Sequence, residues 1–285
     1  MWSAAYPGGS GAASFGFLST LETQAFVLRA VDFGESDRIA HLLTPATSRL
    51  TVIAKGAKRS KRRFAGTLDL FNLLDVRIER RRANTMGRLE QARLLDAFDL
   101  LRTRPARFAL ACYLAELVDR LAPEGSGGAD ARELYAVVLG SIRAVAAREP
   151  DARLRALLEL RVLAALGLRP ELRRCVRCGR DIEVSELTAR SGAVPFHVAE
   201  GGPLCGSCEA GPEGVVAVHL GTLRALEQGL RLPLDRLDRL ALGAQATAEA
   251  QALLSRFLRF HVGFEVRSER FLDSVLAGDA TRASG

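Results

Sequence analysis

The side chains with the clearest chemistry form a run of cations, six of them within nine residues. All three lysines of the protein fall in this run, which extends from Lys55 to Arg63, contains no acidic residue and is called the basic loop below. It lies between two apolar segments that have the pattern of β-strands. Cations on a loop between strands can follow phosphates, and a solvated loop without a partner is disfavoured because such close like charges repel one another. The expected phosphate contacts are Lys55, Lys58, Arg59, Lys61, Arg62 and Arg63.

A second set of arginines is a candidate extension of this surface. Three of them, Arg80 to Arg82, are consecutive and lie at a predicted hairpin. If the tip of this hairpin lay beside the basic loop, it would extend the surface of positive charge. The alternative is an ordinary charged turn. The flanking Phe64 and Phe71 suit either base stacking or core packing, and we favour the core. The second-tier phosphate candidates are Arg29, Arg38, Arg80, Arg81 and Arg82.

Four of the five cysteines form two C-x-x-C pairs with the spacing of a metal site. Cys175 and Cys178 make one pair and Cys205 and Cys208 the other, and the 26 residues between the pairs leave room for two short strands. Four thiolates hold Zn²⁺ in a closed tetrahedron with no position for an activated water, so we expect one structural zinc ion. A redox dithiol or two disulfides is disfavoured because no βαβ pattern surrounds the motif.

Other reactive side chains have simpler explanations. His197 lies between the two pairs and could replace a cysteine, but a surface histidine is favoured because four thiolates already complete the site. Cys112 lies on the apolar face of a predicted helix, so we expect a buried thiol. Asp32, Glu35 and Asp37 could bind Mg²⁺, although a solvated turn is favoured. No Walker A, G-x-S-x-G or H-E-x-x-H motif occurs, so we expect a protein that is not an enzyme.

The positive charge of the chain is concentrated in its first third. The 285 residues carry a net charge of +7 and a pI near 9.6, and residues 22–98 hold 15 Lys and Arg against 9 Asp and Glu. A basic module followed by nearly neutral ones fits a nucleic-acid-binding domain joined to partner modules. No apolar run approaches the ~20 residues that cross a bilayer, and the cysteine arrangement favours a reducing compartment. We therefore expect a cytoplasmic, nucleoid-associated protein with no membrane partner.

The hydrophobic pattern predicts an α+β multidomain protein, with an all-helical domain interrupted by a four-cysteine zinc module. Residues 24–98 contain five short strand-like segments, typical of an OB-type β-barrel, although SH3-like barrels share the spacing. Further on the period becomes helical, with Asp151 as a candidate N-cap and one long helix over about 246–276. The expected divisions are a disordered tail (1–20), an OB-fold domain (21–100), a first helical part (105–170), the zinc module (171–214), a second helical part (215–277) and a tail (278–285).

The last predicted helix carries phenylalanines among arginines. An aromatic face beside arginines can receive an acidic, aromatic peptide tail, but core packing explains the phenylalanines more simply and is favoured. The candidate partner-binding residues are Arg259, Arg267 and Arg270.

The order of several short motifs resembles the RecO family of bacterial DNA repair and recombination mediators. The similarity runs over residues 23–276, nearly the whole chain outside its ends. The motifs are Ala-Phe-Val-Leu at 25–28, Phe-Gly-Glu-Ser-Asp at 33–37, Leu-Leu-Thr at 42–44, Lys-Gly-Ala-Lys-Arg at 55–59, Phe-Ala-Gly-Thr-Leu at 64–68, Phe71, and Arg-Ser-Glu-Arg-Phe-Leu at 267–272.

This resemblance implies an N-terminal OB fold, a helical domain and, in many members, a zinc module. It also implies binding of single- and double-stranded DNA, annealing of complementary strands, and help in loading RecA, an indirect partner, onto strands coated with single-strand-binding protein, together with RecR. In the family, the tail of that coating protein contacts the helical domain. The chain departs from the family at Thr47 and Ser48, where glycine is common, and at Arg62, where serine is frequent.

Two other functions fit the same elements. An RNA-binding or scaffold protein could use an identical barrel and zinc module, and competition between single-stranded DNA and RNA of equal length would separate the two. A zinc-dependent nuclease would need an open position on the metal, which four cysteines do not leave.

Overall fold

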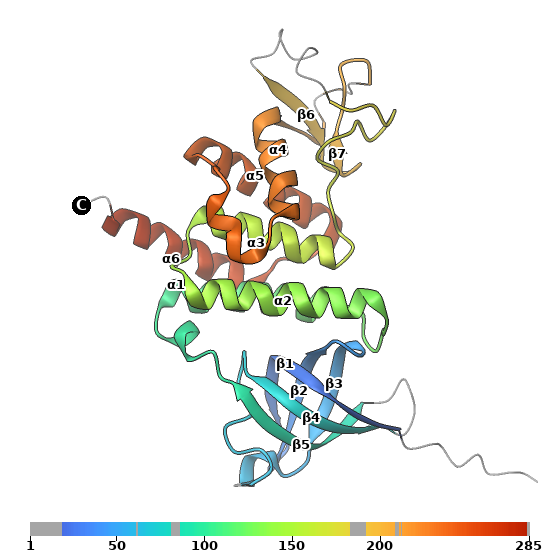
Figure 1. The fold of residues 1–285 in the computed structure, drawn as a ribbon, viewed down its shortest axis with the longest axis vertical. Coiled ribbons are helices and arrows are strands. Elements are labelled where there is room, and N and C mark those ends of the chain that lie inside the picture. Colours follow the sequence, from blue (N-terminus) through green and yellow to red (C-terminus); the bar gives the residue numbers. More distant parts are fainter. Residues whose placement is uncertain are drawn as a thin grey trace, which may run out of the picture.

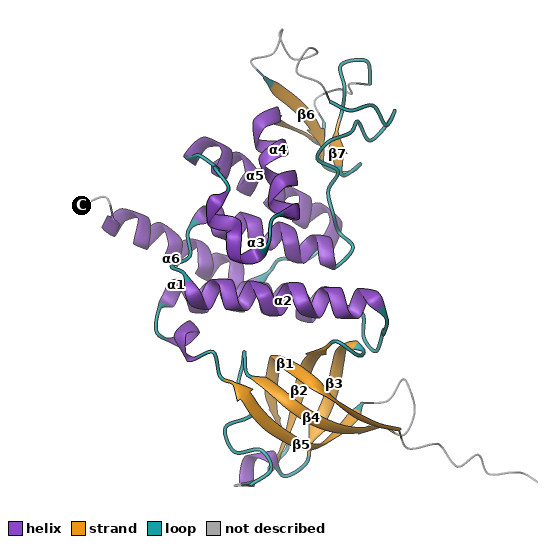
Figure 2. Ribbon diagram, viewed as in Figure 1, coloured by secondary structure: helices purple, strands orange, loops and turns teal. Residues whose placement is uncertain are grey.

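Five strands close into a barrel at one end of the molecule (Figures 1 and 2). The computed structural model describes residues 19–60, 62–80, 86–182, 192–208, 211 and 213–283, with side chains as far as 278. Around the barrel the order is β1-β2-β3-β5-β4, closed by antiparallel pairing of β1 with β4 and a short parallel pairing of β3 with β5. This confirms the predicted five-stranded OB-type barrel. The strands are β1 (Ser19–Phe33), β2 (Asp37–Thr44), β3 (Ser48–Ala54), β4 (Leu73–Arg80) and β5 (Gly87–Asp96).

Alternating residues of each strand contribute one face to the barrel core, and in β1 the other face is buried as well, where Phe26 and Leu28 join the core of the helices. In β4, for example, Leu74, Val76 and Ile78 are buried while the residues between them face outward. Phe64 and Phe71 are only 4% and 0% exposed. These two rings therefore belong to the core, as expected, and their faces are not available to stack on bases.

Within the described residues, six helices follow the barrel and form the middle of the molecule. Asp151 caps α3 as predicted, because its Oδ1 accepts a hydrogen bond from the N–H of Leu154 at 2.6 Å. None of the helices in the described part of the chain combines the length and apolar character needed to cross a membrane. The helices are α1 (Pro105–Leu121), α2 (Ala129–Ala147), α3 (Ala152–Ala165), α4 (Leu220–Arg231), α5 (Ala244–Val262) and α6 (Arg267–Ala283), with short 3₁₀ segments at Asp99–Arg102 and Leu234–Arg239.

Near both ends of the chain, the elements differ from those predicted from the sequence. The single long helix predicted over 246–276 is wrong, because Gly263 adopts a left-handed conformation (φ 70°) that ends α5 and starts a turn before α6. The tail predicted from Gly278 is also wrong in part, since α6 continues to Ala283. At the other end, Ser19 and Thr20 are paired in β1, while residues 1–18 of the expected tail lie outside the described residues.

Polar contacts from α1 and α3 hold the last helix to the domain. The carboxylate of Glu116 on α1 accepts hydrogen bonds from the N–H groups of Arg267 and Ser268 at 3.0 and 2.9 Å, which caps α6. Burial alone would raise the pKa of Glu116, but these hydrogen bonds and one from the Ser268 hydroxyl hold the pKa below its usual value. On α3, the buried Arg155 lies 3.1 Å from the Glu269 carboxylate of α6 and 3.8 Å from that of Glu159. Separate stretches of sequence thus fix α6.

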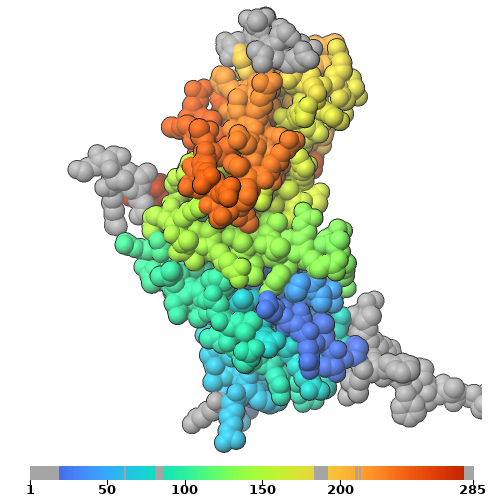
Figure 3. All heavy atoms as spheres, viewed as in Figure 1, coloured from blue at the N-terminus to red at the C-terminus, as the bar shows by residue number. Residues whose placement is uncertain are grey.

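A small three-stranded sheet, ordered β7-β6-β8, lies at the end of the molecule opposite the barrel (Figure 1). Its strands are β6 (Ala193–His197), β7 (Gly202–Pro203) and β8 (Val215–His219). The first two lie between the C-x-x-C pairs, as the length of the spacer predicted. Figure 3 shows barrel, helices and this cysteine module following one another along the long axis.

The barrel is joined to the helices by specific contacts as well as by apolar packing. His41 Nδ1 of β2 lies 2.5 Å from Asp119 Oδ1 of α1. The loop between α1 and α2 adds to the edge of β3, where Arg49 contacts Glu124 at 3.0 Å and its carbonyl accepts a hydrogen bond from the N–H of Gly125 at 2.9 Å. These contacts set the barrel firmly against α1 and α2.

Candidate nucleic-acid interface and metal centre

The basic loop is fixed against the turn between β1 and β2. Gly56 adopts a left-handed conformation (φ 68°), and its N–H donates a hydrogen bond to Asp37 Oδ1 at 2.8 Å. The N–H of Lys58 donates to the carbonyl of Ser36 at 2.9 Å, and Ala57 between them is buried. The backbone of the loop therefore has a defined position before any ligand binds.

Three cations of the loop face the carboxylates of this turn. A hydrogen bond from the N–H of Gly56, followed by one from Lys55, lowers the pKa of Asp37. Among the described residues, only the cysteines group three or more metal-ligating side chains closely enough for an ion, so these carboxylates serve as ion-pair partners. We call Asp32, Glu35 and Asp37 the acidic turn. The pairs are Lys55–Asp37 at 3.0 Å, Lys58–Asp32 at 3.1 Å and Arg59–Glu35 at 3.9 Å.

The other end of the basic loop contributes to a hollow on the outer face of β1, β4 and β5. This hollow holds about 420 Å³ and is lined by four arginines and two carboxylates. Arg77 lies 3.9 Å from Glu22, and Arg93 lies 2.8 Å from Asp75. Its lining keeps a net positive charge. We call this site the arginine hollow, and its cations are Arg62, Arg63, Arg77 and Arg93.

Strand register explains why these arginines meet. Arg77 of β4 is paired across the strands with Glu22 of β1, and Asp75 of β4 with Arg93 of β5. Arg63 is directed by a hydrogen bond from its Nη2 to the Lys55 carbonyl at 3.2 Å. Neither Arg77 nor Arg93 was among the phosphate contacts predicted from the sequence. The sequence did contain a signal, because Arg77 and Arg93 occupy positions of β4 and β5 that alternate with apolar residues and therefore face outward.

Two of the second-tier arginines that the structure describes, Arg29 and Arg38, lie in different places. Arg38 is half-buried and lies 3.2 Å from Asp32, and its Nη1 donates a hydrogen bond to the Leu68 carbonyl at 3.1 Å, so it supports the acidic turn. Arg29 lines a different pocket, of about 420 Å³, between the barrel and α1, together with Arg120 and Arg267.

Three of the predicted phosphate contacts lie outside the described residues. They are Lys61, Arg81 and Arg82. Arg80, at the end of β4, is half-buried.

The three candidate partner-binding arginines separate into two places. Arg259 and Arg270 line one hollow of about 290 Å³ between α5 and α6, where Arg270 lies 3.0 Å from Glu265. Arg267 lines the pocket that contains Arg29. Of the phenylalanines nearby, Phe257 is buried as expected for core packing, whereas Phe260 is 60% exposed.

The four cysteines predicted to bind metal come together. Each offers its Sγ atom, and the four Sγ atoms lie within 4.8 Å of one another. Zinc–thiolate bonds of about 2.3 Å in a tetrahedron separate the sulfurs by about 3.8 Å, and Cys178 Sγ lies 3.6 Å from Cys205 Sγ. The donor set and its size therefore fit one tetrahedral zinc ion held by Cys175, Cys178, Cys205 and Cys208.

Local backbone geometry supports this site. Gly179 has φ 74° and donates its N–H to the Cys175 carbonyl at 2.8 Å, as expected of such a knuckle, whereas Gly206 does not take a positive φ. A hydrogen bond from Ser207 lowers the pKa of Cys205, whereas interactions with Cys205 and Cys178 raise the pKa of Cys208.

The remaining reactive side chains take no part in this centre. His197 Nδ1 accepts a hydrogen bond from the N–H of Glu200 at 3.2 Å, and His197 is not among the grouped ligands. Burial raises the pKa of the Cys112 thiol to about 11, in keeping with an unreactive side chain.

An OB-type barrel followed by a helical domain that carries a four-cysteine module defines the architectural class of the chain. Two family models match it, "Recombination protein O N terminal" over residues 18–98 and "Recombination protein O C terminal" over residues 102–270. The chain therefore belongs to the RecO family of DNA repair proteins.

Two relatives match this chain over most of their length. The DNA repair protein RecO of Anaeromyxobacter dehalogenans (strain 2CP-C) is 38% identical over 252 residues, covering 87% of this chain and 94% of the relative. That of Symbiobacterium thermophilum is 31% identical over 260 residues, covering 90% and 98%.

Proposed function

We propose that this protein is a non-enzymatic mediator of DNA repair and homologous recombination. It binds single- and double-stranded DNA, anneals complementary strands and, together with RecR in the RecF pathway, helps to load RecA onto strands coated with single-strand-binding protein. The observation that carries the proposal is the arginine hollow beside the basic loop on one face of the barrel. With DNA as its ligand, the protein acts in the cytoplasm at the nucleoid.

The electrostatics of this face support phosphate binding. The four arginines of the hollow are exposed on the barrel, where they can meet a DNA backbone without a rearrangement of the core. Lys55, Lys58 and Arg59 stand in partly exposed pairs with the acidic turn, so a phosphate can compete for them. A single basic surface that screens two strands lowers their mutual repulsion, which favours annealing.

The helical domain offers a site for a protein partner. Arg259 and Arg270 line a hollow that also holds the apolar side chains Leu258, Phe264 and Val266 and three carboxylates, Glu265, Glu269 and Asp273. The acidic, apolar tail of single-strand-binding protein would pack on these apolar side chains and would reach the arginines by displacing carboxylate partners such as Glu265, which lies 3.0 Å from Arg270. We assign Arg267 a lesser part in this contact, because it lines a separate pocket.

Zinc is proposed as a structural cofactor. The four thiolates of the cysteine module would complete its coordination, and the bound ion would stabilise a segment with few core residues of its own. The module lies at the opposite end of the molecule from the barrel (Figure 1), so it has no direct part in DNA contacts on the barrel face.

Annealing of complementary oligonucleotides coated with single-strand-binding protein tests the proposal. The protein should accelerate annealing without nucleotide, and a variant with alanine at Arg62, Arg63, Arg77 and Arg93 should accelerate it less. A matched variant with alanine at Arg259 and Arg270 should still anneal bare strands but should lose its effect on coated ones. Tight binding to bare strands without any annealing of coated strands would instead favour an RNA-binding or scaffold protein, which competition with RNA of equal length would identify.

A further inference from the structure

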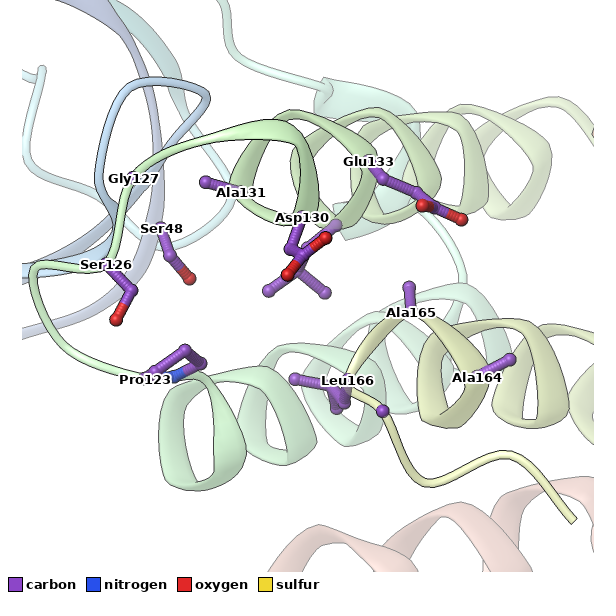
Figure 4. Close-up of a pocket in the computed structure, with 12 residues that line it drawn as sticks. Ser48, Pro123, Ser126, Gly127, Asp130, Ala131, Glu133, Ala164, Ala165 and Leu166 are labelled. Atoms are coloured by element: carbon purple, nitrogen blue, oxygen red, sulfur yellow. The ribbon is translucent and has the colours of Figure 1, made fainter.

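A pocket at the junction of the barrel and the helical domain has no part in the function proposed above. It holds about 460 Å³ and lies between the β2–β3 turn, the α1–α2 loop, the start of α2 and the end of α3 (Figure 4). We call it the junction pocket. Its polar side chains are Ser48, Ser126, Asp130 and Glu133.

Ser48 shows that the junction pocket is built to receive a polar group. Its side chain is buried, with the residue only 2% exposed, yet its Oγ has no hydrogen-bond partner among the described residues. In Figure 4 this hydroxyl and the carboxylate of Asp130 both point into the space between the start of α2 and the end of α3. A buried hydroxyl without a partner is unfavourable. A polar ligand in the pocket would satisfy it.

The lining selects a cation. Asp130 and Glu133 are three residues apart, so they lie on the same side of α2. The end of α3, Ala164 to Gly167, adds the negative end of one helix dipole and the start of α2 adds the positive end of another, so the two carboxylates decide the charge of the pocket. No Lys, Arg or His occurs among the described residues that line the pocket. In a protein with a net charge of +7, this is a local negative site.

The same lining argues for an organic cation over a metal ion. Calcium takes six to eight oxygen ligands and magnesium an octahedral set, as a rule with several carboxylates. Here two carboxylates stand among aliphatic walls that include Pro123, Leu134 and Leu166. Outside the cysteine module, the described residues contain no group of three ligating side chains. Aliphatic walls can cover an alkyl chain while the polar side chains bind its charged end.

We propose that the junction pocket binds an alkylammonium group, the chemistry shared by a lysine side chain and a free polyamine. The ammonium donates hydrogen bonds to the Asp130 carboxylate and to Ser48 Oγ, and the aliphatic walls cover the chain. Because Ser48 belongs to the barrel and Asp130 to α2, the bound group ties the two domains together. Ser48 has φ 52°, a conformation that glycine adopts more readily, and glycine in its place would lack the hydroxyl.

Titration calorimetry and thermal melting of the full chain test the proposal, with n-butylamine and putrescine as probes. Both amines should bind and raise the melting temperature to a plateau. Asp130→Asn should weaken binding by about tenfold or more, and Ser48→Gly, which removes the hydroxyl without backbone strain, by about fivefold. Glu213→Gln, an exposed carboxylate outside the pocket, is the matched control and should change nothing.

The two probes distinguish the sources of the group. Tighter binding of putrescine, with the difference abolished by Glu133→Gln, would identify a free polyamine whose second ammonium meets Glu133. Equal affinities for the two amines would identify a single ammonium, as on a lysine side chain. The proposal is overturned if neither amine binds, if the Asp130→Asn variant binds them as tightly as the unmodified protein, or if only Mg²⁺ stabilises the protein in an Asp130-dependent way. Should Asp130→Asn fail to fold, Ser48→Gly decides alone.

Discussion

Replacing the four cations of the arginine hollow with alanine should flatten the salt dependence of DNA binding. Each phosphate contact contributes about 0.7 to the slope of log K against log salt on single strands and about 0.9 on duplex. One contact for each arginine gives a change in slope of about 2.8 on single strands. The affinity ratio between the unmodified protein and the variant should therefore shrink about 50-fold as salt rises from about 50 to about 200 mM. The substituted residues are Arg62, Arg63, Arg77 and Arg93.

Fluorescence anisotropy of a labelled oligonucleotide measures this slope directly. The control removes four exposed arginines of the helical domain and therefore lowers the net charge by the same amount. If both variants lost the same slope, net charge and not the hollow would account for binding, and an unchanged slope in the first variant would remove the hollow from the interface. The control positions are Arg132, Arg143, Arg236 and Arg239.

Three further outcomes test the structural reasoning. Cys178→Ser, or a chelator, should abolish protease resistance of the cysteine module, and unchanged digestion would exclude a structural metal. Burial raises the pKa of Glu159 from 4.5 to about 7. The folded state then binds more protons than the unfolded one, so stability in urea should fall as pH rises through this range, by up to ~3 kcal/mol; a Glu159→Gln variant with the same slope would contradict this. Glu116→Ala should cost about 1–2 kcal/mol by uncapping α6, and an unchanged thermal melt would show that the cap contributes nothing.

Much of the fold could be predicted because it depends on local pattern. The alternation in residues 24–98 indicated all five strands, and Asp151 was recognisable as an N-cap from its residue type and place. The break at Gly263 was missed, because apolar residues continue at helical spacing on both sides and only the backbone conformation ends α5. The C-terminal tail was predicted to begin at Gly278, but α6 continues to Ala283.

Of the candidate sites, the one that depends on local spacing could be predicted from the sequence, and the one that depends on strand pairing could not. The cysteine quartet depends on spacing along the chain and could be predicted in full. The arginine hollow depends on which residues of β1, β4 and β5 lie opposite one another, and Arg93 has no neighbouring cation in the sequence to draw attention to it. The pairing of the basic loop with the acidic turn also required the barrel, since Lys58 and Asp32 are far apart in the chain.

The acidic turn makes the two ends of the basic loop electrostatically different. Its carboxylates neutralise one end of the basic loop and repel phosphate, while the other end of the loop opens onto the arginine hollow. Under the proposed function, a nucleic-acid backbone would be drawn first to the arginine hollow across β1, β4 and β5, and it would reach Lys55, Lys58 and Arg59 only by displacing the acidic turn. A strand bound in this way would have one preferred path over the barrel, and a second strand would approach from the solvent side of the first.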